Sequence, residues 1–342
     1  MKLKKDIHIF SSLLGSVLAM NISVTDALLL VKNETNNNSI KKVCDKILKN
    51  ISTGMNLSNA LELSGFSKRY CSFIRIGELS GDLPEVLLKY SELEELKSEN
   101  KNQLFGALFY PCIIIVLAVS VFTILNIIFF KAVPEKYLNF INNSTGYILY
   151  SAYNFISNLI IQTQINLFQL IIATIFIFIS AKIFQFNILY DYILLKIPIV
   201  NRIIINYNLS IFCFTAGRLI KKNVPLTESM DMAAEALENY FIRKQIRILS
   251  KNILSVHNPS NINGSIIVDD FILQVIFIGL KKENIVEVMS ELSDIYIKKS
   301  KTIATRFFYL LPFAIIIFLG IIILLISGSM FFTYWNTALL VK

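Results

Sequence analysis

One duplicated stretch constrains this chain more than any other feature. Residues Phe73–Tyr90 read FIRIGELSGDLPEVLLKY, and a diverged copy, VIFIGLKKENIVEVMSEL, stands 202 residues later at Val275–Leu292. Gly77 aligns with Gly279 in this register. Because a repeat at a fixed offset marks one structural unit used twice, the chain consists of two related halves. Other matched pairs are Leu83 with Ile285 and Glu85 with Glu287.

The second part of each copy has the spacing of an amphipathic helix. In the first copy we expect turns at Gly77 and Gly81, then Asp82 as the helix cap, with Pro84 in the first turn. Glu85 completes a D-x-x-E capping box. The second copy keeps Gly279, which we also place in a turn. The expected buried stripes are Leu83, Val86, Leu87, Tyr90 and Leu93, and Ile285, Val288, Met289, Leu292 and Ile295.

A second pair of copies occurs earlier in each half. Gly15–Ala27 (GSVLAMNISVTDA) matches Gly217–Ser229 (GRLIKKNVPLTES) at the same offset. A basic, then apolar N-terminus resembles a signal peptide, but a signal peptide does not recur in mid-chain. We therefore interpret Asp6–Asn21 as the first helix of a folded domain. Further predicted features are a Ser23 cap, a loop at 32–38, and helices at 39–51 and 57–63 that Gly54 separates.

The composition is that of a membrane protein. Hydrophobic residues make up 54% of the chain and charged residues only 17%. Three stretches carry no charge and are long enough to cross a bilayer as helices. These predicted transmembrane helices are 104–130, 165–181 and 307–333.

The positions of lysine and arginine orient these spans. Residues 1–103 hold 14 of them and residues 182–306 hold 16, whereas residues 131–164 hold two. Because cytoplasmic segments carry the basic excess, the N-terminus is predicted to be cytoplasmic and the C-terminus outside. The net charge of +9 then reflects topology and not nucleic-acid binding.

The predicted fold is an all-α, multi-pass membrane protein with two homologous cytoplasmic helical bundles and three transmembrane helices. The segments, in order, are a helical domain at 1–103, transmembrane helix 1 at 104–130, a short outer loop with an interfacial helix at 131–164, transmembrane helix 2 at 165–181, a second helical domain at 182–306, transmembrane helix 3 at 307–333, and an outer tail at 334–342.

Motifs for catalysis or cofactor binding are absent from the sequence. It has no P-loop, no GxGxxG and no GxSxG, and its two histidines, His8 and His257, have no partner at metal-ligand spacing. The predicted spans contain no Asp, Glu, Lys, Arg or His, which argues against ion-coupled transport. We expect no enzymatic activity, no cofactor and no metal; Glu78 and Asp82 are weak candidates for binding a cation.

Five motifs in order resemble one protein family. They are IRIGELSGDLPEVL at 74–87, LFYPCIII at 108–115, AVPEKY at 132–137, LLKIPIVNRII at 194–204 and AGRLIKKNVPLTESMDMAAEALEN at 216–239. The pattern is similar to that of the GspF/PilC family, the inner-membrane platform proteins of type IV pilus, type II secretion and competence pseudopilus machines. The second copy departs from the family turn, because Leu280 and Glu283 replace the glutamate and glycine found at Glu78 and Gly81.

The resemblance implies a non-enzymatic role in the cytoplasmic (inner) membrane. Such a protein couples a cytoplasmic hexameric assembly ATPase to the extraction of pilin or pseudopilin subunits and to fibre growth. Its implied partners are that ATPase, the pilins, other inner-membrane assembly proteins and the lipid bilayer, and it is expected to form a homo-oligomer. A membrane permease and a generic membrane scaffold with duplicated helical domains stay open as alternatives.

Individual residues can be given expected roles. Arg75, Glu78, Glu235 and Asn239 are candidate contacts to a partner such as the ATPase. Three prolines, Pro111, Pro134 and Pro198, are expected to shape the beginning or end of a span or domain.

Overall fold

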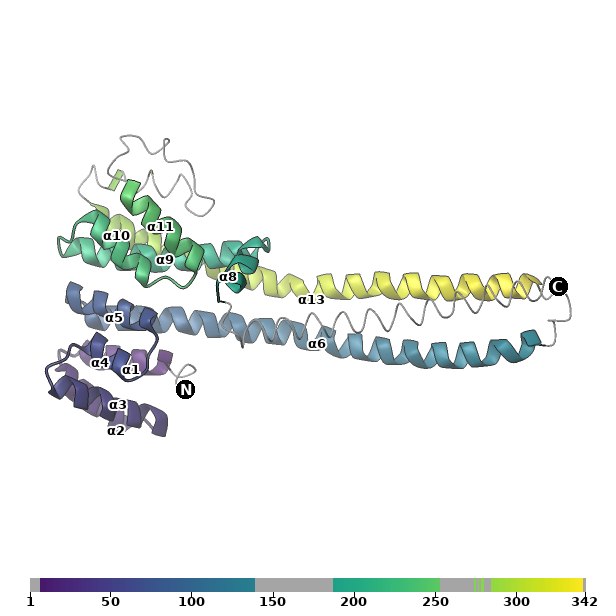
Figure 1. Ribbon diagram of the computed structural model, residues 1–342, viewed down its shortest axis with the longest axis horizontal. Coiled ribbons are helices and arrows are strands. Elements are labelled where there is room, and N and C mark those ends of the chain that lie inside the picture. Colours follow the sequence, from purple (N-terminus) through teal and green to yellow (C-terminus); the bar gives the residue numbers. More distant parts are fainter. Residues whose placement is uncertain are drawn as a thin grey trace. The chain divides into compact units, whose positions relative to one another are not determined.

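The computed structural model describes residues 7–138, 187–252, 274, 276, 278–279 and 284–340, and within them every regular element is a helix (Figure 1). The chain divides into two compact units. Unit 1 comprises Met1–Gln103 and Asp191–Phe307, and unit 2 comprises Leu104–Tyr190 and Phe308–Lys342. The two predicted helical domains therefore share one compact unit and are not independent of each other.

The first half of unit 1 begins with five short helices whose sequence neighbours pack together. Serine side chains cap the start of two of these helices. The Ser23 Oγ accepts a hydrogen bond from the Asp26 amide, as the sequence predicts. The Ser67 Oγ accepts one from the Tyr70 amide. Gly54, with a φ of 87°, lies between the third and fourth helices as expected. The helices are α1 (Ile7–Leu18), α2 (Val24–Glu34), α3 (Asn38–Ser52), α4 (Leu57–Leu63) and α5 (Lys68–Ser80).

The second half of unit 1 uses a similar set of elements. A turn that contains Pro198 separates the first two helices, so this proline lies where a domain-shaping residue was predicted. Ile199, next to it, has a left-handed φ of 74°. The helices are α8 (Asn187–Lys196), α9 (Val200–Lys221), α10 (Leu226–Glu235) and α11 (Tyr240–Asn252).

Two long helices of equal length complete the described chain. Helices α6 (Leu83–Leu138) and α13 (Ile285–Leu340) each contain 56 residues. Their first residues are 202 positions apart in the sequence, and so are their last residues. At 1.5 Å per residue each is about 84 Å long. Helix α6 includes the predicted first span, 104–130, and α13 includes the third, 307–333.

The long helices correct two predicted boundaries. The outer loop was expected to begin at Lys131, but α6 continues through Lys131 and Pro134 to Leu138. The predicted tail at 334–342 is helical as far as Leu340. The remainder of the outer loop and the second span, 165–181, lie outside the described residues.

Two of the described helices are long and apolar enough to cross a membrane by length and composition. The first is the Ile285–Phe318 part of α13, in whose most apolar stretch only 6% of the residues are buried within the protein. The second is α9, but most of its residues are buried inside unit 1. Burial by protein identifies α9 as a core helix of unit 1.

Glycines allow the long helices to approach their neighbours closely. A Cβ atom placed on Gly77 would lie 3.1 Å from Leu83 Cδ1 and from Val86 Cβ. One on Gly279 would lie 3.1 Å from Ile285 Cδ1. Gly77 and Gly279 therefore serve helix packing and are helical, which corrects their prediction as turn residues. Gly81 is the turn residue, with a left-handed φ of 67° at the end of α5.

A second pair of glycines makes an equivalent contact. A Cβ on Gly15 would lie 3.1 Å from Leu87 Cβ, and one on Gly217 would lie 3.0 Å from Met289 Cβ. The α1–α2 and α9–α10 turns also match, because Asn21 and Asn223 have φ values of 60° and 62°. Asparagine tolerates that left-handed conformation better than most other residues with a side chain.

The predicted apolar stripe of α6 is buried or half-buried at every position, and that of α13 is so at every position except Ile295. Ile295 is 41% exposed, and Tyr296, at 2%, fills the core beside it. The stripe in the second half is thus displaced by one residue at this point.

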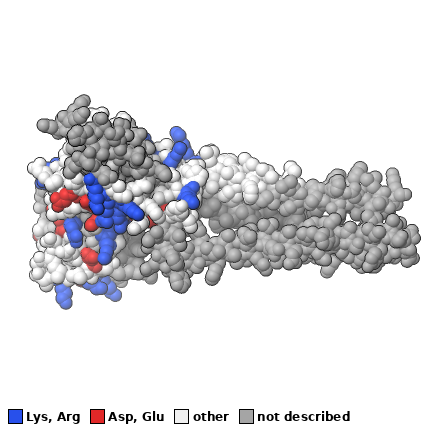
Figure 2. All heavy atoms as spheres, turned by 45° about the horizontal axis from the view of Figure 1, so that its top comes forward, with Lys and Arg blue, Asp and Glu red and all other residues white. Residues whose placement is uncertain are grey.

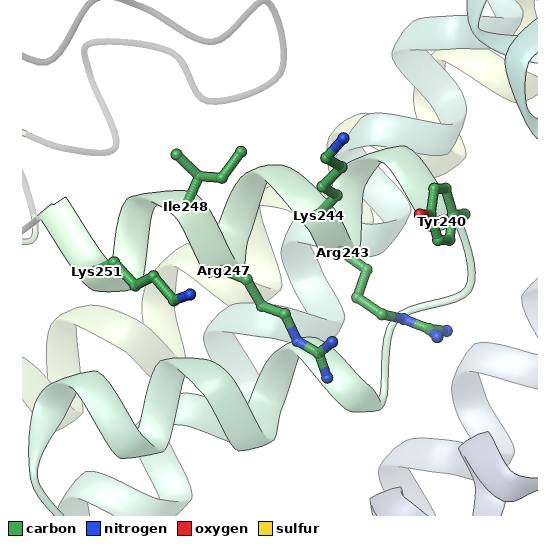
Figure 3. A pocket seen from close by; sticks show the side chains of 6 residues that line it. All are labelled: Tyr240, Arg243, Lys244, Arg247, Ile248 and Lys251. Atoms are coloured by element: carbon green, nitrogen blue, oxygen red, sulfur yellow. The ribbon is translucent and has the colours of Figure 1, made fainter.

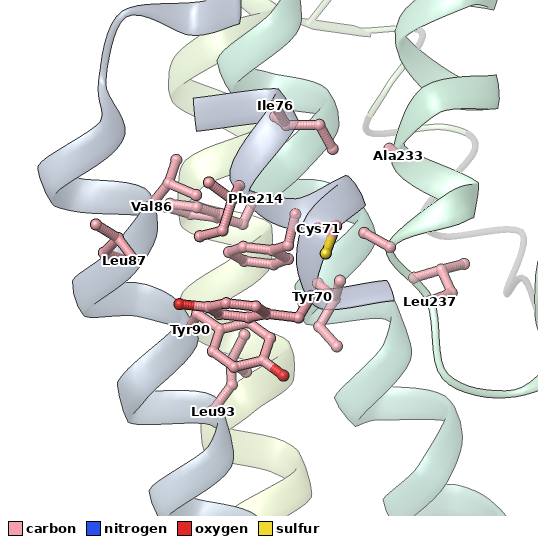
Figure 4. Close-up of a cluster of buried hydrophobic side chains, with 14 of the residues drawn as sticks. Tyr70, Cys71, Ile76, Val86, Leu87, Tyr90, Leu93, Phe214, Ala233 and Leu237 are labelled. Carbon is pink, nitrogen blue, oxygen red and sulfur yellow. The ribbon is translucent and has the colours of Figure 1, made fainter. Parts of the chain in front are cut away.

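An aromatic cluster joins the two halves inside unit 1. Helix α5 packs against α9 and α10, and Figure 4 shows Tyr70, Tyr90 and Phe214 turned toward one another. The Phe73 and Phe214 rings are stacked with centroids 6.1 Å apart, and Tyr90 meets Phe73 edge to face at 5.2 Å. Aromatic contacts of this kind add about 0.5–1.5 kcal/mol each beyond the burial of their area. They hold the halves together as one core.

Candidate functional site

The acidic turn of the first half, Asp82 to Glu85, binds the basic C-terminal end of α9 in the second half. Arg218 Nη1 donates to Asp82 Oδ2 at 3.1 Å, and its Nη2 donates to Glu85. Lys221 Nζ reaches the same Asp82 oxygen at 3.3 Å. The Arg218 guanidinium also lies 5.1 Å from the Phe214 ring centroid, so it links the ion pairs to the aromatic cluster.

These contacts correct the predicted capping box. The Asp82 carbonyl accepts the hydrogen bond of the Val86 amide, as the start of α6 requires, but its carboxylate faces Arg218 and Lys221. Burial acts to raise the pKa of Asp82, and the hydrogen bonds and charges of Lys221 and Arg218 outweigh it and hold that pKa below its ordinary value. Asp82 is therefore ionised in the folded protein at neutral pH.

A second ionic cluster crosses the same interface. Glu238 Oε1 accepts from Lys97 Nζ at 2.8 Å and pairs with Arg69 Nη2 at 3.1 Å. Desolvation acts to raise the pKa of Glu238, but the charges of Arg69 and Lys97 overcome it and lower the pKa. Lys89 of α6 pairs with Asp294 of α13 at 3.1 Å. This ion pair adds a third link across the interface.

Glu78 and Arg75 have local partners in the first half. The Glu78 carboxylate accepts a hydrogen bond from the Ser58 amide at 3.3 Å, in the first turn of α4, where the Asn56 cap makes no side-chain bond. Glu78 thus completes the N-terminus of α4. Arg75 is exposed and donates to Asn59 Oδ1 at 3.3 Å. Glu78 and Asp82, the two weak cation candidates, have different partners.

Of the two candidates in the second half, one is accessible and one is not. Glu235 is the last residue of α10, is exposed, and pairs with Arg247 at 3.4 Å. Asn239 is 3% exposed, and its Oδ1 caps α11 by accepting from the Phe241 and Ile242 amides. The structure therefore gives Asn239 a capping role at the start of α11.

The predicted proline positions can be placed along the helices. Pro84 lies in the first turn of α6 as expected, and Pro111 is buried within the same helix. The backbone of α6 passes through Pro134 without ending there.

Among the described residues, no group of three or more His, Cys, Asp or Glu is gathered closely enough to hold a metal ion. Cys44, Cys71 and Cys213 are buried thiols, and burial raises the pKa of each. The arrangement of charges and rings at the interface is suited to holding the two halves in one orientation.

Sequence reasoning missed the basic partners of the acidic turn. Arg218 and Lys221 stand where the first copy has Ser16 and Ala19, so the two copies differ in charge where they meet. This difference in charge is visible when the aligned residues of the two copies are compared.

The fold defines a class of protein: a duplicated chain whose described elements are all helices, with one 56-residue helix in each half. Comparison with known families identifies it further. The family model for type II secretion system (T2SS) protein F matches residues 10–130 and again residues 212–333, which together exceed half of the chain. The chain belongs to this family.

Curated relatives carry names from two machines. The chain is 22% identical over 339 residues to the type IV pilus assembly protein PilC of Thermus thermophilus, covering 96% of this chain and 81% of the relative. It is 21% identical over 329 residues to TapC, a type IV pilus assembly protein of Aeromonas hydrophila, covering 93% and 78%. It is 20% identical over 253 residues to the type II secretion system protein F of Vibrio cholerae, covering 72% and 61%.

Proposed function

We propose that this chain is a non-enzymatic platform protein of the cytoplasmic membrane in a type IV pilus-like or type II secretion machine. In this role it couples a cytoplasmic hexameric ATPase to the extraction of pilin or pseudopilin subunits from the bilayer and to fibre growth. The observation that carries the proposal is that the family model for secretion protein F matches the chain twice. The similarity to relatives named for pilus assembly and for secretion supports it.

The long helices support a mechanical role. In each half one uninterrupted helix begins in the packed core of unit 1 and continues into the uncharged sequence of unit 2. A continuous helix transmits displacement along its axis because its backbone hydrogen bonds run along that axis. We propose that α6 and α13 carry movement of the cytoplasmic unit to the spans that face pilin helices.

The topology and assembly belong to the same proposal. The N-terminus and unit 1 lie in the cytoplasm, the C-terminus lies outside, and residues 104–130, 165–181 and 307–333 span the bilayer. The two halves are copies in a register of 202 residues, which the glycine contacts and helix ends of both halves support. A fibre and a hexameric motor on one axis favour a small symmetric oligomer of this chain, with other inner-membrane proteins around it.

Deletion of the gene tests the proposal. The deletion strain should make pilin or pseudopilin at normal levels and insert it in the membrane, yet lack fibres, secretion or DNA uptake, and the full-length gene should restore them. The output that is lost identifies the machine. Normal fibre assembly, secretion and uptake in the deletion strain would rule the proposal out.

A further inference from the structure

Helix α11 carries a strongly basic outer face. Its exposed or half-exposed residues include Arg243, Lys244, Arg247 and Lys251, while Ile242, Ile246 and Leu249 on the opposite side are buried in the core. Figure 2 shows Lys and Arg side chains gathered on the face of the molecule that it displays. The helix is therefore amphipathic, with a cationic outer side.

The basic residues line a shallow pocket of about 250 Å³. Figure 3 shows Arg243, Arg247 and Lys251 extending from one side of α11 and Lys244 from another. We call these four residues, with Tyr240 and Ile248 of the same lining, the α11 basic face. The volume of the pocket and the number of positive charges around it suit a ligand with a compact negative group.

The α11 basic face lacks enough acid to neutralise it. Glu235 pairs with Arg247, but Lys244 and Lys251 form no ion pair with any acid in the described part of the chain. The Arg243 Nε atom is buried and makes no hydrogen bond there. Unsatisfied donors of this kind cost free energy unless a ligand accepts from them.

Two exposed apolar side chains beside the charges indicate a lipid surface as the partner. Tyr240 is 44% exposed and Ile248 is 49% exposed. A folded acidic protein could pair with the charges, but exposed aromatic and aliphatic residues among lysines and arginines are typical of helices that lie at a membrane interface. The α11 basic face has this composition.

The chain also connects this face to the predicted bilayer. Asp191 Oδ2 accepts from the Tyr240 amide at 2.9 Å and so fixes the first turn of α11. Asp191 follows the predicted second span, 165–181, by only ten residues. We propose that the α11 basic face binds the headgroups of anionic phospholipids at the cytoplasmic surface of the membrane, a contact that does not depend on the platform role.

A single-tryptophan reporter tests this contact in the intact chain. Trp335 is the only tryptophan, so Trp335→Phe with Tyr240→Trp places one reporter on α11. The full-length protein is reconstituted in phosphatidylcholine vesicles, with and without 30 mol% phosphatidylglycerol, both containing brominated phosphatidylcholine as a quencher. We expect quenching and a blue shift of the reporter fluorescence in the anionic vesicles, and the loss of both in high salt because salt screens the charges.

Charge removal provides the matched comparison. In the reporter background, Lys244→Gln, Arg247→Gln and Lys251→Gln together should lower the docking equilibrium about a hundredfold, since each basic residue near an anionic surface contributes roughly 1 kcal/mol. The control triple, Lys42→Gln, Lys46→Gln and Lys49→Gln, removes the same charge from the exposed face of α3 and should leave quenching unchanged. Both triples alter surface residues, so circular dichroism should show equal helix content.

Three outcomes would overturn the proposal. One is equal quenching in neutral and anionic vesicles, and another is an equal loss in both triples. The third is a reporter whose fluorescence stays that of a water-exposed tryptophan in the anionic vesicles and shifts only after a cytoplasmic protein fraction is added. That result would assign the face to a protein partner.

Discussion

Arg218 Nη1 lies 3.1 Å from Asp82 Oδ2, and this ion pair joins the basic end of α9 to the acidic turn between α5 and α6. The Arg218 side chain is only 14% exposed. The pair explains why the acidic turn belongs to the first half alone: its partner is the second half. The duplicated halves have diverged at their contact surface so that each completes the other.

The first prediction concerns this pair. Arg218→Gln should destabilise unit 1 by about 1–3 kcal/mol, because it leaves Glu85 without its charged donor and Asp82 with Lys221 alone. A double-mutant cycle with Asp82→Asn, followed by thermal melting in detergent, should show coupling. The control cycle uses Lys32 and Asp45, an ion pair with side chains 34% and 56% exposed, for which coupling should be at most a few tenths of a kcal/mol. Equal coupling in the two cycles would mean that Arg218 is an ordinary surface charge.

The second prediction concerns the packing glycines. Gly77→Ala and Gly279→Ala each add a Cβ about 3.1 Å from a side chain across the contact, and should cost about 1–3 kcal/mol by overpacking. Gly106 is also helical, but a Cβ added there would have no neighbouring atom within 4 Å, so Gly106→Ala should be neutral or raise the melting temperature. Tolerance of alanine at 77 and 279 would contradict the close helix contacts.

The third prediction concerns the asparagines with positive φ. Asn223→Gly should preserve stability, whereas Asn223→Ala should lower it by roughly 1 kcal/mol, because alanine disfavours a φ of 62°. Asn21 should behave in the same way in the first half. Melting temperatures of the four variants give the comparison, and no difference between glycine and alanine would show that these turns relax.

The fourth prediction concerns acid. The pKa values of Asp82 and Glu238 are lowered in the folded protein, so the unfolded chain binds more protons as the pH falls. The stability that these groups contribute is complete above their unfolded pKa values, near 4, and is lost as the pH drops through the lower folded values. Glu238→Gln should therefore flatten the fall in melting temperature below about pH 4.5. An unchanged slope would show that the Arg69 and Lys97 contacts do not form in solution.

Local signals in the sequence predicted much of the fold. The Ser23 cap and the apolar stripe of α6 depend on residues within a few positions of one another, and both were confirmed. Gly77 was misplaced because a glycine's sequence context does not distinguish a turn from a helix that another helix approaches. Only the contact with Leu83 and Val86 makes that distinction.

The candidate site was less predictable for the same physical reason. A D-x-x-E sequence favours a capping box, but Arg218 competes for both carboxylates, and it stands 136 residues after Asp82. Asn239 was expected at a partner surface, and its burial as a cap depends on the tertiary contact of Asn208 with the Asn239 amide. Side-chain partners at such separations follow from tertiary packing, which local pattern does not contain.

Capture of native complexes tests the central proposal most directly. Full-length chain carrying an affinity tag, expressed at native level and cross-linked in living cells, is purified from membranes in mild detergent, and its partners are identified by mass spectrometry. The platform role predicts enrichment of a hexameric assembly ATPase together with pilin or pseudopilin subunits over a control membrane protein with the same tag. Recovery of neither the ATPase nor any pilin, from cells that are assembling fibres or secreting, would contradict it.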